Sequence, residues 1–374
     1  MDARESLKAL RTRIDEIDGK LAPLFGERME LSKQAAAIKA SGNMPILDET
    51  RERQVVERAV GLTDESLRGE VSLLMRAILA LSRERQRQLL LSAEEPLLPA
   101  PRKPVQGALR CAYQGVPGAW SEQALIKLFP EAERLPEDYF EDVFIAVRER
   151  RADYGVVAIE NSKTGAIGET YDLLRRYGCF IVGRTWMDIS QCLLAREGVA
   201  LTDIREVFSH PEGFKQCGHF LRRWPWDLTA CRNTAVAAQQ CAESDNRRTA
   251  AIGSRFAAEL HGLNVLVPDI MDAADNRTSF VVIARSPEYD EHSDLISLTF
   301  STAHRSGALC EALLPFMASR LNLMRIESRP AGPDKFRFFA EVQGNVTDPA
   351  AEDALRHVAA ACDYFEVIGC YRLS

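Results

Sequence analysis

Polar side chains in the first 95 residues are spaced so that several of them could act together on one small molecule. On a helix, Arg28 and Lys39 point within about 20° of each other and lie about 16 Å apart along the axis, so both could bind one small anion. Arg11 lies about 25 Å from Arg28 on a straight helix, and therefore belongs either to the solvated surface or to the pocket of a partner chain. Two polar pairs share helix faces further along the chain: Asp48 with Glu52, next to Arg51, and Ser82 with Gln86. Each of these residues taken singly is also compatible with solvated surface, and Arg28 could extend to water from the edge of an apolar seam.

A second group of polar residues follows short apolar runs between residues 105 and 285. The runs "LRCAY", "YGVVAIE", "REVFSH", "LTACR" and "TAAIG" each end in or lead into glycine, serine, asparagine or threonine, and most are followed directly by a helical pattern. Ligands bind at the carboxyl ends of strands in open α/β sheets, and helix N-termini favour anions. A helix N-cap is the simpler interpretation of any one junction. Five junctions in one domain favour a site for a small anionic molecule.

Composition narrows the class of protein. The 374 residues carry a net charge of −7 and a pI near 5.6, which argues against nucleic acid or an anionic membrane as the main partner. The nine cysteines are scattered without a C-x-x-C pair, and the charged start "MDARESLKAL" lacks a signal segment, so a cytoplasmic location is expected. There is no H-E-x-x-H, Walker A or G-x-G-x-x-G motif, so neither a metal nor a cofactor is expected.

The chain divides at two polar stretches. The proline-rich "PLLPAPRKP", residues 96–104, predicts a linker, and "SPEYDEHSD", residues 286–294, a softer boundary. The predicted domains are therefore residues 1–95, 105–285 and 294–374.

The first domain is predicted to be all-α. A heptad seam of apolar residues predicts a helix over 5–40, which is too long for two short companions to bury and therefore indicates a dimer. Asp48 is expected to cap a second helix running to Leu62, and Thr63 a third running to Leu91.

The other two domains contain strands. Residues 105–285 alternate apolar runs with helical patterns, which is typical of an α/β fold. Residues 294–374 follow the order strand, helix, strand, strand, helix, strand, which predicts an α+β ferredoxin-like fold. This last segment lacks a cluster of acids, bases or nucleophiles, which indicates a binding or structural unit.

The polar set of the first domain resembles the active-site pattern of the all-helical chorismate mutases. The resemblance covers residues 5–90 and rests on Arg11, Arg28, Lys39, Asp48, Arg51, Glu52, Ser82 and Gln86. It implies an intertwined dimer, with one arginine supplied by the other subunit. Chorismate rearranges to prephenate without proton transfer, so catalysis must come from positioning and electrostatics. In this interpretation the three arginines hold the carboxylates, Lys39 and Gln86 donate to the ether oxygen, and Glu52 with Asp48 binds the ring hydroxyl.

The middle domain resembles the prephenate dehydratases. "YQGVPGAWSEQA", "AIENSKTGAIGETYDLL", "SHPEGFKQC", "NTAVAA" and "IGSRFAAELHGLNVL" match segments of that family in its order. The resemblance implies two lobes of the periplasmic-binding type, no cofactor, and a substrate cleft approached by Ser121, Asn161, Ser162, Ser209, His210, Gln216, Asn233, Thr234, Ser254 and Thr278. Thr278 would help the hydroxyl leave as carbon dioxide is lost. His210 as a helix cap and Gln216 as a solvent-facing residue are the alternatives.

The last domain resembles the ACT domains, which sense amino acids. "SGAL", residues 306–309, and "IESRP", residues 326–330, match the segments that line the phenylalanine site in that family, which implies effector contacts from Gly307, Ala308, Leu309, Glu327, Ser328, Arg329 and Pro330. Alternatively, Gly307 only starts a helix and Glu327 with Arg329 forms a surface ion pair of little energetic value.

One departure from the dehydratase pattern lies in "DNRTSF", residues 275–280. The family has arginine after the threonine, whereas this chain has Ser279. Because side chains alternate along a strand, Arg277 shares the face of Ser279, and we hypothesise that it partly replaces the missing arginine.

Together the resemblances imply a bifunctional chorismate mutase and prephenate dehydratase of phenylalanine synthesis, with L-phenylalanine as effector. Two alternatives stay open: a dehydratase that prefers arogenate, and a carboxylate sensor without dehydratase activity, since a shared fold does not decide function.

Overall fold

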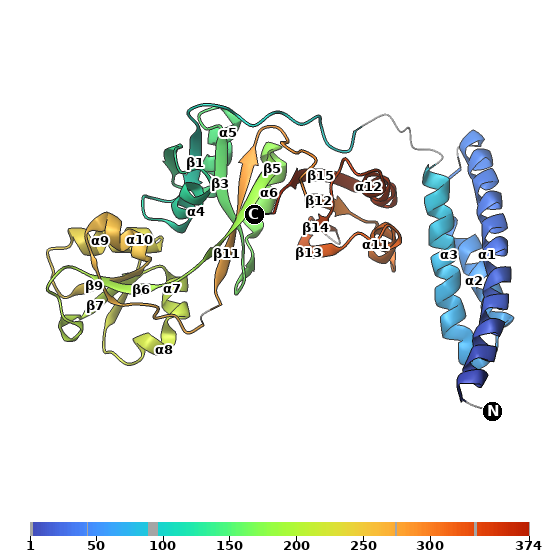
Figure 1. Cartoon of the computed structure of the whole chain (residues 1–374), viewed down its shortest axis with the longest axis horizontal. Coiled ribbons are helices and arrows are strands. Elements are labelled where there is room, and N and C mark those ends of the chain that lie inside the picture. Colours follow the sequence, from blue (N-terminus) through green and yellow to red (C-terminus); the bar gives the residue numbers. More distant parts are fainter. Residues whose placement is uncertain (1–2, 43, 89–95, 274, 333–334, 374) are drawn as a thin grey trace. The chain divides into compact units, whose positions relative to one another are not determined.

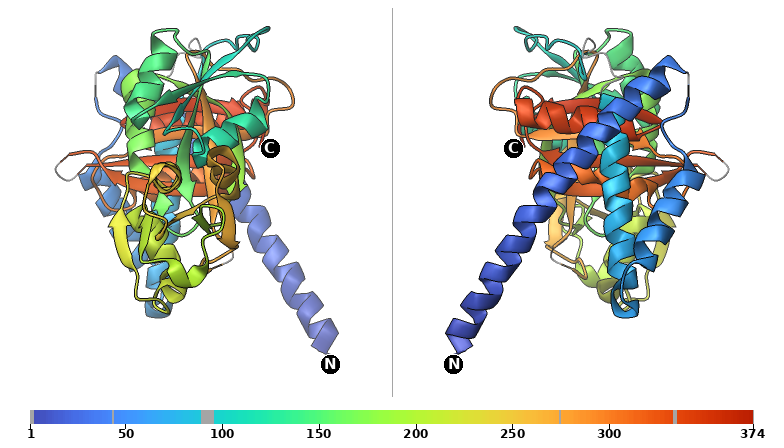
Figure 2. Two further views of the ribbon diagram at one scale, coloured as in Figure 1. Left: turned by 90° about the vertical axis from the view of Figure 1, so that its left-hand side faces the viewer. Right: turned by 90° about the vertical axis from the view of Figure 1, so that its right-hand side faces the viewer.

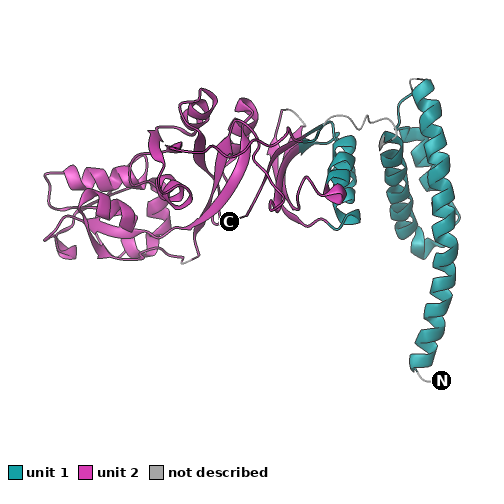
Figure 3. Cartoon of the chain, turned by 45° about the horizontal axis from the view of Figure 1, so that its top comes forward, with its two compact units in different colours: residues 1–97, 300–320, 352–365 teal, residues 98–299, 321–351, 366–374 magenta. Residues whose placement is uncertain are grey.

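The structure, a computed structural model, describes residues 3–42, 44–88, 96–273, 275–332 and 335–373. The chain forms two compact units, which are described separately: residues 1–97, 300–320 and 352–365 form unit 1, and residues 98–299, 321–351 and 366–374 form unit 2 (Figure 3). The predicted third domain contributes residues to both units, and the three-domain division stays a prediction. Within the described ranges, no helix has the length and apolarity needed to cross a membrane.

Unit 1 contains a bundle of three helices, in which α3 packs against both α1 and α2. Its elements are α1 (Ala3–Ser41), α2 (Glu49–Gly61), a 3₁₀ turn (Glu65–Leu67), α3 (Arg68–Gln88), α11 (Ala308–Ala318) and most of α12 (Pro349–Ala361). The helix predicted over 5–40 is confirmed as α1, which runs as one continuous rod (blue in Figure 2).

Of the two predicted N-caps in this bundle, one is confirmed and the other is wrong. Asp48 caps α2 as expected, because its side chain accepts a hydrogen bond from the Arg51 backbone N–H. Thr63 does not cap the third helix: its hydroxyl donates back to the Ala59 carbonyl at 3.0 Å, and the 3₁₀ turn has Asp64 at its N-cap position. The predicted end at Leu91 lies outside the described residues.

The apolar seam of α1 is exposed within this single chain. Leu10 and Leu24 are 61% and 62% exposed, and Leu7, Ile14, Ile17 and Leu21 follow the same pattern. The two shorter helices therefore cover only part of α1, as its length predicts.

Unit 2 is built on two sheets. The larger has the strand order β13-β14-β12-β15-β5-β11-β3-β1-β2, with the short β4 paired to β3, and the smaller has the order β10-β6-β9-β7-β8 (Figure 1). The strands of residues 105–285 are β1 (Arg110–Gln114), β2 (Glu133–Glu137), β3 (Tyr154–Asn161), β4 (Gly165–Ala166), β5 (Phe180–Asp188), β6 (Cys192–Ala195), β7 (Glu206–Ser209), β8 (Asp227–Ala230), β9 (Thr249–Gly253), β10 (Asn264–Val267) and β11 (Arg277–Ala284).

Helices follow these strands closely, as the junctions predict. They are α4 (Trp120–Leu128), α5 (Phe140–Arg148), α6 (Gly168–Tyr177), α7 (Pro211–Gln216), α8 (Gly218–Leu221), α9 (Thr234–Glu243) and α10 (Arg255–His261), with a 3₁₀ turn at Leu201–Asp203. The sheets have separate apolar cores, so they form two lobes. The chain crosses between the lobes twice, from β5 to β6 and from β10 to β11, which confirms the predicted two-lobed α/β architecture.

The last eighty residues have the predicted βαββαβ order: β12 (Leu295–Ser301), α11, β13 (Leu323–Pro330), β14 (Phe336–Gln343), α12 and β15 (Tyr364–Tyr371). Their strands form one end of the larger sheet, and β15 joins them to β5 of the middle segment. The order β15-β12-β14-β13 places the last strand beside the first, as in a ferredoxin-like sheet.

Candidate active sites

In the helical bundle, polar residues of α1 and α3 meet at a partly buried spot. Arg28 donates to the Ser82 hydroxyl, and Gln86 donates to the Ser32 hydroxyl at 3.0 Å. Ser82 and Gln86 are only 5% and 7% exposed. Burial lowers the pKa of the Arg28 guanidinium, although the Glu52 charge acts against this, and the group keeps its positive charge. The structure thus brings Arg28 of α1 together with Ser82 and Gln86 of α3.

The other residues predicted to form a site in the bundle make different contacts or are exposed. Lys39 donates to the Ile46 carbonyl in the loop before α2, and Arg51 is exposed. Glu52 forms an ion pair with Arg83, which is 4% exposed and which sequence reasoning missed. The position of Arg83 directly after the predicted site residue Ser82 could have indicated it. Arg11 is exposed on α1, far from Arg28 on the same helix.

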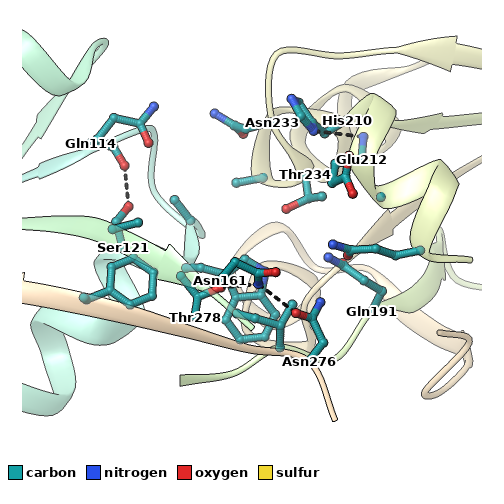
Figure 4. Close-up of a pocket in the computed structure, with 18 of the residues that line it drawn as sticks. Gln114, Ser121, Asn161, Gln191, His210, Glu212, Asn233, Thr234, Asn276 and Thr278 are labelled. Carbon is teal, nitrogen blue, oxygen red and sulfur yellow. Dashed lines mark hydrogen bonds between the residues drawn. The ribbon is translucent and has the colours of Figure 1, made fainter. Parts of the chain in front are cut away.

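In unit 2, a cleft of about 360 Å³ lies between the two lobes, a volume in the range of small-molecule sites. The β1, β3 and β11 ends supply Gln114, Asn161 and Thr278, and the second lobe supplies residues from the starts of α7 and α9. Of the predicted residues, those lining the cleft are Gln216 and, labelled in Figure 4, Ser121, Asn161, His210, Asn233, Thr234 and Thr278.

The polar centre of the cleft is a chain of hydrogen bonds. Asn161 donates to the Thr278 hydroxyl at 2.9 Å and to the Asn276 side chain at 2.7 Å (Figure 4). Because Thr278 accepts this bond, its own hydroxyl hydrogen is available, and none of the described residues accepts it. The Asn161 side chain is held in turn by the backbone N–H of Lys163, which donates to its amide oxygen Oδ1 at 2.9 Å. The arrangement presents a hydroxyl donor to whatever occupies the cleft.

Two predicted residues of the second lobe are helix caps. His210 Nδ1 accepts from the Glu212 backbone N–H at 3.1 Å, and the Asn233 side chain accepts from the Val236 N–H at 2.8 Å. Burial lowers the pKa of His210, against the opposing effect of Glu212, so the imidazole is neutral near pH 7 with its proton on Nε2. Capping and lining the cleft are compatible here, since both residues do both.

Several buried polar atoms of the cleft have no hydrogen-bond partner among the described residues. They include Nδ2 of Asn233, Nδ2 of Asn276 and Oε1 of Gln191. Buried polar atoms are normally paired, so such atoms in a cleft indicate a site for a polar ligand. The N-termini of α7 and α9 add positive potential, whereas the lining residue Arg232 is paired with Asp138 at 2.8 Å. Gln191, Asn276, Arg232 and Glu212 line the cleft but were missed, although Asn276 lies within "DNRTSF".

Three predicted residues do not line the cleft, and their hydroxyls hold neighbouring segments. Ser162 accepts from the Arg277 N–H at 2.9 Å. Ser209 is fully buried beneath α7, where a Cβ on Gly213 would lie 2.5 Å from its Oγ. Ser254 caps α10 by accepting from the Ala257 N–H at 3.0 Å. Ser121 lines the cleft, but its hydroxyl donates back to the Gln114 carbonyl.

The hypothesis for Arg277 is wrong in its main point. The strand register does put Arg277 and Ser279 on one face, but Arg277 pairs with the exposed Asp188 at 2.8 Å. The Ser279 hydroxyl instead accepts from Nε of Arg184 on β5 at 2.6 Å. The reason is cross-strand geometry: Arg184 lies diagonally across from Ser279 and fills the buried space, whereas Arg277 is at the rim.

The two predicted effector segments fall in different units. Gly307 has a left-handed φ of 81° at the N-cap of α11, which favours glycine, with Ala308 and Leu309 in the first turn. On β13, Glu327 and Arg329 do not pair with each other as the alternative supposed. Arg329 pairs with Asp172 of α6 at 3.5 Å and Glu327 lies 4.0 Å from Arg325, while Ser328 and Pro330 alternate outward.

Comparison with known proteins agrees with the geometry. Family models match residues 10–87 (Chorismate mutase type II) and 111–288 (Prephenate dehydratase). The Bifunctional chorismate mutase/prephenate dehydratase of Escherichia coli is 32% identical over 99% of this chain and 97% of its own length. Arogenate dehydratase/prephenate dehydratase 2 of Arabidopsis thaliana is 36% identical over 74% of this chain and 78% of its own.

Among solved structures, a prephenate dehydratase of Arthrobacter aurescens in complex with L-Phe superposes with a TM-score of 0.65 and 29% identity, covering 71% of this chain and 90% of that one. The similarity to the Escherichia coli enzyme extends over nearly the whole of both chains and includes both catalytic segments. The chain therefore belongs to the bifunctional chorismate mutase/prephenate dehydratase family.

Proposed function

We propose that this chain rearranges chorismate to prephenate in its helical bundle and converts prephenate to phenylpyruvate, carbon dioxide and water in its two-lobed cleft. The observation that carries the second activity is the hydrogen bond from Asn161 to Thr278. This bond leaves the threonine hydroxyl free to donate into a cleft where the Nδ2 atoms of Asn233 and Asn276 have no partner among the described residues. The first activity is supported by Arg28, Ser82 and Gln86 meeting beside Glu52.

The dehydratase step needs a dianion held in place and a hydroxyl group helped to leave. The bond between the ring and its carboxylate breaks, its electron pair completes the aromatic ring, and hydroxide departs and takes up a proton. We assign to Thr278 a hydrogen bond to the departing oxygen, where charge builds in the transition state. The amide side chains of Asn233 and Asn276 and the helix N-termini are the groups proposed to hold the carboxylates.

The mutase step needs only positioning and charge. We assign carboxylate contacts to Arg28, Arg51 and, from a second copy of the chain, Arg11. Lys39 and Gln86 would donate to the ether oxygen, and Glu52 with Asp48 would bind the ring hydroxyl. For that role Glu52 must exchange part of its ion pair with Arg83 for the substrate.

A second copy of the chain is part of the proposal. The exposed Leu7, Leu10, Ile14, Ile17, Leu21 and Leu24 seam supports it, because an apolar stripe of this length on a soluble helix is normally covered. A dimer at least is therefore expected, and light scattering of the purified chain measures it. A monomer at micromolar concentration would argue against both the dimer and the role of Arg11.

We further propose that the ferredoxin-like segment is an ACT domain that binds L-phenylalanine and lowers dehydratase activity, and that the enzyme is cytoplasmic. The βαββαβ order and the left-handed Gly307 at the start of α11 support the domain assignment. The coupling between effector and substrate is expected to be about 1–3 kcal/mol.

The test is a two-activity assay on the purified chain. Loss of chorismate and appearance of phenylpyruvate are followed by ultraviolet absorbance, with and without millimolar L-phenylalanine, and arogenate is supplied in parallel. Phenylpyruvate from prephenate supports the dehydratase. Faster turnover of arogenate would transfer the assignment to an arogenate dehydratase, and turnover of neither would support a carboxylate sensor.

A further inference from the structure

A buried cluster of charges lies behind the dehydratase cleft. Arg184 of β5 is 4% exposed and donates to Ser279 Oγ at 2.6 Å, to Glu341 at 2.6 Å and to Glu160 at 3.0 Å. Arg325 of β13 shares Glu160, at 2.8 Å. The cluster thus contains two guanidinium groups and the carboxylates of Glu160 and Glu341, and the Glu327 carboxylate lies 4.0 Å from Arg325 at its edge.

The strand register connects this cluster to the proposed catalytic residues. On β3 and β11, Thr278 lies opposite Asn161, and Ser279 lies opposite Glu160. Successive side chains of a strand point to opposite faces. The Asn161–Thr278 pair therefore faces the cleft, and the Glu160–Ser279 pair faces the other side of the sheet. There the Arg184 guanidinium binds both Glu160 and Ser279.

The pairing of β3 with β11 is irregular next to Ser279. The register of β11 against β3 shifts between Ser279 and Phe280. A bulge interrupts the ladder of backbone hydrogen bonds and bends the strand. The Arg184 guanidinium, with its planar fork of donors, supplies side-chain bonds across the two strands beside that shift.

The other side of the cluster belongs to the ferredoxin-like strands. Glu341 lies on β14, is 9% exposed, and is bound by Arg184. Burial works to lower the pKa of Arg184, but Glu341 and the other acidic neighbours offset this and leave the pKa above its usual value. The guanidinium is therefore permanently charged and is bound by a carboxylate of the ferredoxin-like strands.

We propose that Arg184 is a positioning residue of the dehydratase, which fixes Thr278 and Asn161 from behind through Ser279 and Glu160 and is itself held by Glu341 of the ferredoxin-like sheet. This inference rests on the proposed dehydratase function. Arg184 does not line the cleft, so its effect on the reaction passes through the two strand ends. The ferredoxin-like strands then contribute to the geometry of the active site as well as to effector binding.

The experiment compares Arg184→Lys and Glu341→Gln with the unchanged chain. Lysine keeps the charge but cannot bind three partners in a plane, so dehydratase kcat falls about tenfold or more while KM for prephenate stays within about twofold. Glu341→Gln removes one holding charge and lowers kcat by about threefold to tenfold. The mutase rate, measured on the same preparations, is unchanged in both variants.

Two controls separate positioning from loss of stability. Arg176→Gln removes a surface arginine of α6 that pairs with Glu141, and leaves dehydratase kcat unchanged. Val147→Ala opens a hole in the fully buried core of the same lobe, which lowers Tm with little change in kcat. The proposal is overturned if Arg184→Lys keeps normal kcat, or if its kcat falls no further than that of Val147→Ala at an equal loss of Tm.

Failure of the proposed function gives a different result, because the unchanged chain would then release no phenylpyruvate. A crystal structure of Arg184→Lys decides the positioning claim in that case. Loss of the 2.9 Å hydrogen bond between Asn161 and Thr278 supports it, and an unaltered bond overturns it.

Discussion

Replacing Thr278 by valine removes the proposed donor and almost nothing else. Valine keeps the β-branched shape that suits a strand, and Asn161 retains the Asn276 side chain and the Arg277 carbonyl as acceptors, at 2.7 and 3.2 Å. The lost hydrogen bond is therefore expected to cost about 1 kcal/mol of folding stability. Loss of a donor aimed at developing charge costs about 3–4 kcal/mol in the transition state, which is a fall in kcat of about a hundredfold or more.

The assay follows phenylpyruvate by absorbance, with prephenate binding measured separately by calorimetry. Thr278→Val is expected to bind prephenate nearly as well as the unchanged chain and to dehydrate it at least a hundredfold more slowly. Thr278→Ser keeps the hydroxyl and is the matched control, with kcat within about tenfold of normal. A Thr278→Val rate close to that of the serine variant would refute the reasoning, because the hydroxyl would then have no part in the reaction.

Three further predictions concern other groups. Lys39→Ala should leave the helical circular dichroism unchanged and cut mutase turnover by about a hundredfold or more; a near-normal rate would remove Lys39 from the site. Burial disfavours the charged form of His210 and lowers its pKa. Its cap on α7 is therefore intact above about pH 6.5 and is lost as the pH falls through the lowered pKa of the folded state. The dehydratase rate should therefore decline on the acid side, and His210→Asn, which keeps a capping acceptor, should flatten that decline; an unchanged acid limb would contradict the assignment. Burial raises the pKa of Glu84 to about 7, with Arg87 acting in the opposite direction, so stability is lost as the pH rises from about 4.5 to about 7. Glu84→Gln should raise Tm at pH 8 and leave it unchanged at pH 5, and an equal shift at both pH values would show that ionisation is not the cause.

Much of the fold follows from local patterns in the sequence. The spacing of apolar residues predicts α1 to within a few residues, Asp48 marks the start of α2, and the strand and helix order of the last domain is read directly from the chain. These features depend on neighbours within a few positions, so periodicity and capping residues are sufficient to predict them. Thr63 shows the limit, because an adjacent residue, Asp64, occupies the cap position.

Some of the residues that line the cleft could likewise be predicted from local patterns, and others could not. Thr278, Asn161 and His210 stand at the ends of elements that the sequence already marks, and all three reach the cleft. Gln191 and Asn276 reach it from the two crossings between lobes; Asn276 lies within "DNRTSF", but neither residue ends a strand or starts a helix.

The sequence by itself determined which segments form helices and strands and which polar residues lie at their ends. Only the tertiary structure decided that Arg184 fills the space beside Ser279 while Arg277, two residues away on the same strand face, turns to the rim. It also decided that Glu52 meets Arg83. The physical reason is that these contacts join residues far apart in the chain, where sheet register and helix packing select one buried partner among several arginines of equal chemistry.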